Sequence, residues 1–301
     1  MFARVSSGDY LSSRGRPMSL AIETLQLTRD FGPARAVDGI DLRVERGTFY
    51  GFLGPNGAGK STTIKMLTGL LAPSGGQIFV LGHDMLDPRQ ALAAKARVGV
   101  IPENLALFDN LTAREYLTFV GRMHLLPRET VRERIGELLS LLGLENEEKK
   151  VTLEYSHGMK KKLALAAALI PNPDLLFLDE PFEGVDAVTS HVIRDLLAGF
   201  VARGSTVFLT SHVLEIVEKL CTHVGIIVRG ELVEQASLQE IRRGHSLEDR
   251  FLERLGADGA AIPKLRWLES QESGIRDQES GGSGVRNQTG TMSPTPDLPD
   301  S

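Results

Sequence analysis

The stretch GFLGPNGAGKST, residues 51–62, joins a short apolar run to the start of a helical pattern. It fits G-x-x-x-x-G-K-[ST], the pattern of a phosphate-binding loop, in which glycines let backbone N–H groups turn inward around phosphates. The N-terminus of the following helix adds a favourable dipole. We expect Lys60 to reach the β- and γ-phosphates of a nucleotide and the Ser61 hydroxyl to ligate Mg²⁺. The expected nucleotide-binding residues of this loop are Gly54, Pro55, Asn56, Gly57, Ala58, Gly59, Lys60, Ser61 and Thr62.

An acidic pair follows another apolar run farther along the chain. In LLFLDEP, residues 175–181, the run places Asp179 at the end of a strand, where its carboxylate is expected to hold Mg²⁺. Glu180 follows directly and is expected to orient or deprotonate the attacking water. His212 ends the next strand pattern, FLTSH, and suits a contact with a γ-phosphate. Each pattern is weak alone, but with the loop at 51–62 they predict nucleotide hydrolysis.

Short apolar runs alternate with amphipathic helical patterns over about residues 20–256. Such runs are typical of strands buried on both faces, so we expect an α/β fold with a central, mainly parallel sheet. Residues 112–143 carry a long helical stretch broken around Pro127, which predicts an inserted helical subdomain. Residues 246–256 are typical of a last amphipathic helix with Ser246 as its cap. The expected strands are TFYGFLG (48–54), RVGVI (97–101), LLFLD (175–179), TVFLT (206–210) and HVGIIV (223–228).

The two ends of the chain differ in composition from this region. Residues 1–18 are rich in Ser, Gly and Arg, and we expect a flexible extension in which Met18 offers an alternative start. Residues 257–301 are rich in Gly, Ser, Pro and acidic residues and contain an imperfect repeat, SGIRDQ and SGVRNQ. Such a tail has too few apolar side chains for a core, so we expect disorder. The expected domains are therefore 1–18, 19–256 with a helical subdomain at about 104–172, and 257–301.

The composition is that of a soluble globular protein, with 301 residues, 42% of them hydrophobic and 24% charged. A net charge of −5 provides no global basic field for nucleic acid or an anionic membrane surface. No apolar run approaches the ~18 residues of a membrane span, and the N-terminus lacks the apolar core of a signal peptide. The single cysteine, Cys221, fits a reducing compartment.

Taken in order, these motifs resemble the nucleotide-binding subunit of an ABC transporter over about residues 20–256. The resemblance implies a P-loop ATPase of ABC type, in which an antiparallel β subdomain and an inserted helical subdomain accompany the central sheet. It also implies that Phe31 stacks on adenine and that Asp186 belongs to the ATP site. The motifs are the P-loop at 54–62, the signature at 155–159 (YSHGM), the Walker B segment at 175–180, the D-loop at 184–186 (GVD) and the switch histidine, His212.

The signature segment implies a site shared by two subunits. In this family, its serine and glycine cap a helix whose N-terminus meets the γ-phosphate bound on the opposite subunit, and the helix dipole favours that anion. Ser156 and Gly158 would play this part, while the P-loop and Walker B residues act within their own chain. We expect lysines 160–162 to form a solvated basic turn. ATP would then hold two subunits together, and hydrolysis would release them.

Three motifs depart from the usual family pattern. The signature is normally Leu-Ser-Gly-Gly-Gln, whereas Tyr155, His157 and Met159 occupy its first, third and fifth places here. We expect function with altered packing, and we hypothesise that His157 makes ATP affinity pH-sensitive. Glu103 replaces a glutamine that usually touches Mg²⁺, and we expect its carboxylate either to coordinate the metal or to sit back from it. Val185 replaces the commoner D-loop leucine and is expected to be neutral.

Several functions are compatible with these motifs. We favour the ATPase of an ABC transporter, and an exporter over an importer because the chain looks most like ABC-2-type exporter ATPases. Its expected partners are a separate transmembrane permease and a second copy of itself or a related ATPase, at the cytoplasmic face of the membrane and without nucleic acid. The alternative is a soluble ABC-type ATPase of translation or DNA maintenance, although those usually carry two cassettes or a long coiled coil. An unrelated GTPase or nucleotide kinase leaves Ser156 and Gly158 unexplained.

Overall fold

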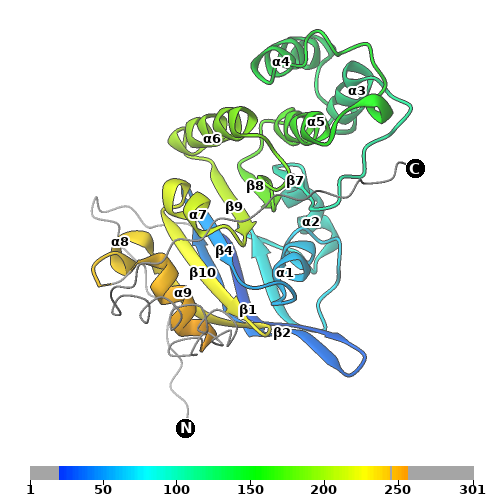
Figure 1. Ribbon diagram of the computed structural model, residues 1–301. Coiled ribbons are helices and arrows are strands. Elements are labelled where there is room, and N and C mark those ends of the chain that lie inside the picture. Colours follow the sequence, from blue (N-terminus) through cyan, green and yellow to red (C-terminus); the bar gives the residue numbers. More distant parts are fainter. Residues whose placement is uncertain (1–19, 245, 257–301) are drawn as a thin grey trace, which may run out of the picture. The chain divides into compact units, whose positions relative to one another are not determined.

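The computed structural model describes residues 20–244 and 246–256. Its centre is a six-stranded sheet with the order β11-β10-β4-β9-β8-β7 (Figure 1). All neighbouring strands are parallel except the edge strand β11, which is antiparallel to β10. Strands β4, β8 and β9 are buried along their whole length, as expected for a sheet covered on both faces. The strands are β4 (Phe49–Leu53), β7 (Val98–Ile101), β8 (Leu175–Asp179), β9 (Thr206–Ser211), β10 (His223–Val228) and β11 (Glu231–Ser237).

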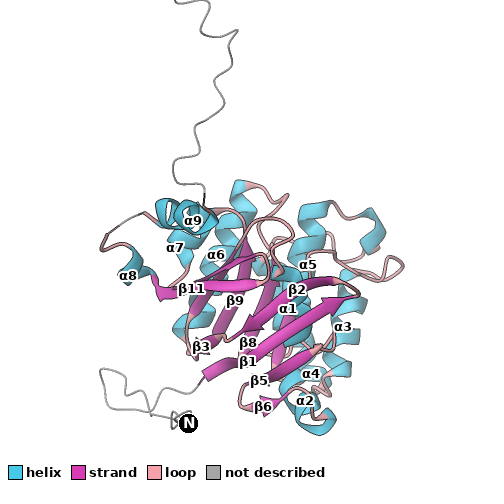
Figure 2. Ribbon diagram, turned by 90° about the horizontal axis from the view of Figure 1, so that it is seen from below, coloured by secondary structure: helices cyan, strands magenta, loops and turns pink. Residues whose placement is uncertain are grey.

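A second, antiparallel sheet has the order β2-β1-β5-β6, with β3 paired to β1. Figure 2 shows its long strands crossing in front of β8 and β9. The two sheets share one apolar cluster, to which the antiparallel sheet contributes Ile22, Leu27 and Ile78 and the larger sheet contributes Phe52, Phe177 and Phe208. The strands are β1 (Leu20–Phe31), β2 (Ala34–Ile40), β3 (Arg43–Glu45), β5 (Gly75–Val80) and β6 (His83–Asp84).

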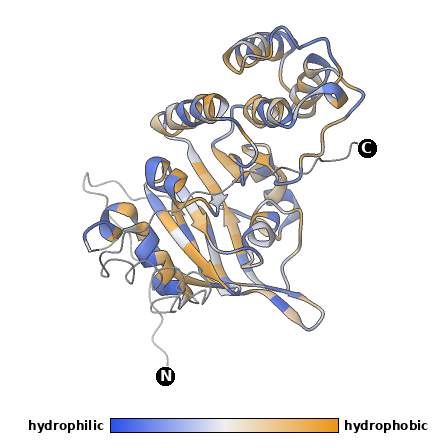
Figure 3. Ribbon diagram, viewed as in Figure 1, coloured by the Kyte–Doolittle hydropathy of each residue, from blue (hydrophilic) through white to orange (hydrophobic). Residues whose placement is uncertain are grey.

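Helices supply the remaining cover, and three of them form a group at one end of the larger sheet (Figure 1). This group comprises α3, α4 and α5, and its apolar side chains join those of α6 and the sheet in a second cluster. In Figure 3 hydrophobic residues are concentrated along the strands of the larger sheet. The helices are α1 (Lys60–Leu67), α2 (Pro88–Lys95), α3 (Ala113–Met123), α4 (Arg128–Leu141), α5 (His157–Leu169), α6 (Ala187–Ala202), α7 (Leu214–Leu220), α8 (Leu238–Ile241) and α9 (Leu247–Leu255).

The fold class expected from the sequence is confirmed, and its elements lie where the patterns predict them. Each expected strand of the larger sheet is present, and the helical stretch at 112–143 breaks between α3 and α4, just before Pro127. Ser246 caps α9 through a capping box with Asp249. The expected extension 1–18 and tail 257–301 lie outside the described residues.

Cys221 lies at the C-terminal end of α7 and packs against strand β4. It is buried, and a Cβ added to Gly51 would lie 3.0 Å from its sulfur and 2.7 Å from a Val217 methyl group. Glycine at position 51 therefore lets the helix approach the strand closely. Among the helices of the described ranges, none combines the length and the apolar character needed to cross a membrane.

Candidate active site

The loop between β4 and α1 has the backbone geometry that its glycines predict. Gly57 and Gly59 have φ of 79° and 109°, a region that side chains rarely adopt. A Cβ added to Gly59 would lie 2.5 Å from the Ala36 carbonyl oxygen, and one added to Gly54 would lie 2.4 Å from the Ile227 carbonyl oxygen. The loop is therefore held by its contacts with β2 and β10, and larger residues at these two glycines would push it out of place.

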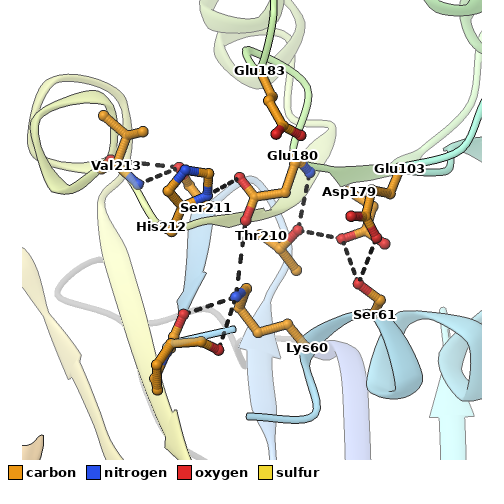
Figure 4. A network of polar contacts seen from close by, with 12 residues as sticks. Lys60, Ser61, Glu103, Asp179, Glu180, Glu183, Thr210, Ser211, His212 and Val213 are labelled. Atoms are coloured by element: carbon orange, nitrogen blue, oxygen red, sulfur yellow. Dashed lines mark hydrogen bonds and ion pairs between the residues drawn. The ribbon is translucent and has the colours of Figure 1, made fainter. Parts of the chain in front are cut away.

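Lys60 lies at the start of α1, buried beneath the loop. Its ammonium donates to the Gly54 carbonyl oxygen at 2.8 Å and to the Pro55 carbonyl oxygen at 3.3 Å. It also lies 3.9 Å from Oε1 of Glu180, whose side chain is almost equally buried. This cation is thus held between the loop and an acidic group at the end of β8 (Figure 4).

Three oxygen groups meet at the N-terminus of α1. The Ser61 hydroxyl lies 3.3 Å from Oδ1 of Asp179 and 3.4 Å from Oε2 of Glu103. Oxygen donors of this kind suit Mg²⁺, which usually takes one or two carboxylates and completes its shell with water and phosphate. The donor set therefore fits the metal expected from the sequence, and Glu103 lies near enough to belong to it.

Thr210 connects the two acidic residues at the end of β8. Its hydroxyl donates to Oδ1 of Asp179 at 2.6 Å and accepts the backbone N–H of Glu180 at 3.1 Å. The side chain is fully buried. Sequence patterns gave no reason to single out this threonine, because it belongs to β9 and meets the acidic pair only through pairing of the two strands.

Glu180 occupies an unusual backbone conformation at the centre of the site. Its φ is 49°, in the left-handed region, which costs a non-glycine residue on the order of 1 kcal/mol or more. Oε2 of its carboxylate lies 3.1 Å from Nδ1 of His212, while Oε1 faces Lys60. Figure 4 shows this carboxylate between the imidazole and the ammonium. The arrangement orients both oxygens of a group that can accept a proton.

Lys60, Ser61, Glu103, Glu180 and His212 are among the residues that line a cavity of about 360 Å³. Three carboxylates, those of Glu103, Glu180 and Glu183, face it together with the cation of Lys60. A bound polyphosphate would add further negative charge, which a divalent cation would offset. The sequence patterns did not identify Ala36 or Glu183 as residues of this cavity. The lining residues are Ala36, Asn56, Gly57, Gly59, Lys60, Ser61, Thr62, Glu103, Glu180, Glu183 and His212.

Comparison with known proteins shows the family to which the chain belongs. Residues 37–183 match a family model described as ABC transporter. A daunorubicin resistance ATP-binding protein of Streptomyces coeruleorubidus is 38% identical over 237 residues, which cover 78% of this chain and 74% of that protein. The Nod factor export ATP-binding protein I of Paraburkholderia xenovorans is 39% identical, over 72% of this chain and 71% of that protein. This chain belongs to the ABC transporter family.

Its fold agrees with that of ABC ATP-binding subunits. A solved structure described as the ATP binding subunit of an ABC transporter superposes with a TM-score of 0.73 at 29% identity, covering 77% of this chain and 98% of that one. The chain is thus an ATP-binding protein and an ATPase of the ABC type.

Eight residues expected in the ABC ATP site are absent from the lining of this cavity: Gly54, Pro55 and Ala58 of the loop, Asp179 beside Ser61, Ser156 and Gly158 of the signature, and Phe31 and Asp186. Phe31 ends β1 and is 48% exposed, with the Arg29 guanidinium 4.6 Å from its ring centroid. Asp186 caps α6, where it accepts the Thr189 backbone N–H at 2.9 Å and the Thr189 hydroxyl at 2.7 Å. These two bonds lower the pKa of Asp186. Stacking on adenine and ATP binding by Asp186 stay predictions.

The signature segment of this ABC ATPase begins helix α5 as expected. Ser156 is its N-cap, and the serine hydroxyl accepts the Met159 backbone N–H at 3.2 Å. Ser156 is exposed and lies outside the lining of its own chain's cavity. A Cβ added to Gly158 would meet nothing within 4 Å, so the backbone here is open to an approaching group.

The expectation of a solvated basic turn at 160–162 was wrong for its central lysine. Lys161 is 5% exposed, and its ammonium donates to the carbonyl oxygens of Glu180 and Glu183. Lys160 is partly exposed and lies 3.8 Å from Asp109. The helix begins at His157, so position 161 points inward while its neighbours stay nearer the surface.

Proposed function

We propose that this ATPase powers export through a separate membrane-spanning subunit. Two relatives carry the names daunorubicin resistance ATP-binding protein and Nod factor export ATP-binding protein, which refer to resistance to a compound and to export of one. We therefore place the chain at the cytoplasmic face of the membrane, bound to a permease. A soluble ABC ATPase of translation or DNA maintenance is not favoured, because these relatives serve resistance and export.

We further propose that each ATP lies between two ATPase subunits. The observation that carries this proposal is the position of Ser156: it caps α5 at the surface and lies outside its own chain's ATP cavity. An exposed helix N-terminus with an open backbone at Gly158 suits the γ-phosphate of a nucleotide held by another copy. ATP then binds two subunits together through its phosphates.

The residues of the cavity have distinct parts in hydrolysis. Ser61, Asp179 and Glu103 would hold Mg²⁺, which supplies positive charge that stabilises the phosphates. Lys60 exchanges its bonds with the loop carbonyls for bonds with phosphate oxygens. Glu180 accepts a proton from the attacking water, and His212, 3.1 Å from its carboxylate, fixes the orientation of that carboxylate.

A substitution of the catalytic carboxylate tests the shared site. Glu180→Gln removes the proton acceptor and keeps its shape, so we expect turnover to fall at least about 100-fold while ATP binding persists. In ATP and Mg²⁺ this variant should elute as a stable dimer in size-exclusion chromatography with light scattering. A monomer under those conditions would contradict the shared site.

The signature serine supplies the complementary test. Ser156→Arg should block hydrolysis and dimer formation with little loss of ATP affinity in the monomer, because the serine serves the neighbour's nucleotide. Binding of a fluorescent ATP analogue to dilute protein measures that affinity. Loss of binding by the monomer would show that Ser156 acts within its own chain.

An aromatic surface, formed by the exposed Phe108 and Phe119 and the partly buried Tyr116, suits the membrane subunit. The Phe108 ring lies 6.1 Å from the Tyr116 ring and 5.4 Å from the Phe119 ring, and Phe108 is 53% exposed. Tyr116 also lines an adjacent groove of about 320 Å³ between α3, α5 and β7. Exposed apolar side chains gathered in this way usually mark an interaction site. We propose that the permease docks here.

A further inference from the structure

A buried lysine joins the signature helix to the turn that carries the catalytic carboxylate. Lys161 lies near the start of α5 and donates to the Glu180 carbonyl oxygen at 2.9 Å and to the Glu183 carbonyl oxygen. These carbonyls stand at the two ends of one tight turn, because the Glu183 backbone N–H donates to the Glu180 carbonyl at 3.3 Å. One ammonium therefore fastens both ends of the turn to α5.

Because the Lys161 ammonium is buried, it depends on its hydrogen bonds to the turn. Lys161 is 5% exposed, and a buried cation is stable only where it is paired and hydrogen-bonded. Burial lowers the pKa of the Lys161 ammonium, and the nearby carboxylates of Glu183 and Glu180 oppose that shift. The cation and the turn thus depend on each other for their positions.

The turn is also the part of the site that is most sensitive to displacement. Glu180 has the left-handed φ of 49°, which persists only where surrounding contacts fix it. Its carboxylate must stay between Lys60 and His212 to serve as a proton acceptor. Without the bonds from Lys161, the turn would lose its hydrogen bonds to α5, and the carboxylate would lose its alignment.

A second contact joins the same two segments. A Cβ added to Gly184 would lie 3.0 Å from Cδ2 of the His157 ring, so the first residue of α5 packs against the D-loop. At its N-terminus, the helix presents Ser156 to the solvent. Helix α5 therefore contacts the turn between Glu180 and Glu183 through Lys161 and the adjoining D-loop through His157, and it offers its N-terminus to a partner.

We propose that Lys161 is a positioning residue that couples the two ATP sites of the dimer. The inference rests on the proposed shared site, in which Ser156 contacts the partner's ATP. When that contact fixes α5, Lys161 fixes the turn at Glu180 and aligns the carboxylate that acts on this chain's own ATP. Occupation of one site thereby favours hydrolysis in the other, which is a coupling between two distinct sites.

The test compares three variants of the full-length chain. Lys161→Met keeps the length and apolar packing of the side chain and removes its donors, whereas Lys161→Arg keeps donors. Lys160→Met, the matched control, removes a neighbouring lysine whose ion pair is with Asp109 instead of the turn. ATPase rates over a range of ATP concentrations give kcat, KM and the Hill coefficient, and thermal melting reports whether each variant is folded.

We expect kcat of Lys161→Met to fall about 10- to 100-fold, the loss typical of a displaced catalytic group, with monomer ATP affinity changed less than about twofold. Its Hill coefficient should fall from above 1 in the parent to about 1, because the sites no longer communicate. Lys161→Arg should recover most of kcat, and Lys160→Met should match the parent. If Lys161→Met does not fold, Lys161→Gln provides the same test with a shorter neutral side chain.

Parent kcat and parent cooperativity in folded Lys161→Met would overturn the inference. A fall in stability without a change in kcat or the Hill coefficient would also overturn it, since Lys161 would then be structural. The Glu180→Gln dimer separates this failure from failure of the shared site. If that dimer forms while Lys161→Met behaves like the parent, only the role of Lys161 is wrong; if it does not form, the shared site itself is wrong.

Discussion

At the scale of single residues, the site depends on the Thr210 hydroxyl, which has no proposed part in the reaction itself. Thr210 bonds to both Asp179 and Glu180, so one buried side chain sets the positions of the proposed metal ligand and of the proposed catalytic residue. Replacing it by valine would keep the shape and leave a buried carboxylate oxygen and a backbone N–H each short of one bond.

We expect Thr210→Val to lose about 1–3 kcal/mol of stability, the usual cost of unsatisfied buried groups, and to lower kcat. The matched control is Thr206→Val in the same strand, because the buried Thr206 hydroxyl accepts the Gly47 N–H at 3.0 Å, away from the site. Urea unfolding should show similar losses for both variants, whereas only Thr210→Val should reduce kcat. Equal kcat values would remove Thr210 from the site's support.

Glu103 gives a second prediction at this scale. Its carboxylate lies 3.4 Å from the Ser61 hydroxyl, so Glu103→Gln should weaken Mg²⁺ binding and raise the Mg²⁺ concentration for half-maximal ATPase several-fold. Glu183→Gln is the control, because it removes the same charge from the cavity lining at a position that no bond joins to Ser61 in the described chain. Titration of ATPase activity with Mg²⁺ at saturating ATP measures this effect. Superimposable curves for parent and Glu103→Gln would show that Glu103 sits back from the metal.

These residues also show what the sequence could predict. Lys60, Ser61 and the acidic pair at the end of β8 could be predicted because each lies in one short segment. The residue pattern of that segment is by itself typical of a phosphate or Mg²⁺ site. Thr210 and Glu183 were missed because their importance arises from the pairing of β8 with β9 and from the direction of a turn. Lys161 was assigned wrongly because a run of lysines suggests solvent, whereas the helix turns one of the three inward.

At the scale of elements, the helices that flank the site begin with strong caps. Ser156 starts α5 and Asp186 starts α6, and both accept a backbone N–H from the third residue of their helix. The D-loop lies between the catalytic turn and α6, so the cap of α6 fixes its far end. Capping is thus a sufficient explanation for Asp186 without any contact with ATP.

The capping role of Asp186 predicts a dependence on pH. Bonds from Thr189 hold the pKa of Asp186 below its usual value, so its contribution to stability is present above the unfolded-state pKa, about 4, and is lost as pH falls toward the folded-state pKa. Asp186→Ala should be less stable than the parent at pH 7, and the difference should shrink below about pH 4. Asp186→Asn, which still caps, should retain most stability. Reduced ATPase activity in stable Asp186→Asn would instead favour the binding role.

At the scale of the whole described domain, the aromatic surface and the ATP cavity lie on different elements. The surface belongs to α3 and the segment before it, whereas the cavity is formed by the P-loop and the ends of β8 and β9. Helix α5 contacts both regions, because Ala164 lines the groove beside the surface and Lys161 reaches the catalytic turn. Phe108 and Phe119 line no part of the cavity, so substitutions there should affect docking without affecting hydrolysis by the isolated chain.

A double substitution of the aromatic surface tests this separation. Phe108→Ser with Phe119→Ser should leave ATPase activity of the isolated chain within about twofold of the parent and abolish its recovery with membranes from cells that express it. The control is Leu92→Ser on α2, since Leu92 is 71% exposed and lies elsewhere. Sedimentation of tagged chain with membranes gives the measurement. Unchanged recovery of the double variant would place the docking surface elsewhere.

The shielded thiol of Cys221 has a practical consequence for such measurements. It is the only cysteine of the chain, it is packed behind β4, and burial raises its pKa, so it stays protonated and slow to react. A cysteine introduced at an exposed position such as Leu125, which is 90% exposed, would therefore be the one that accepts a maleimide dye or spin label. Distances between paired labels in two copies could be followed through a full ATP cycle in the otherwise unaltered protein.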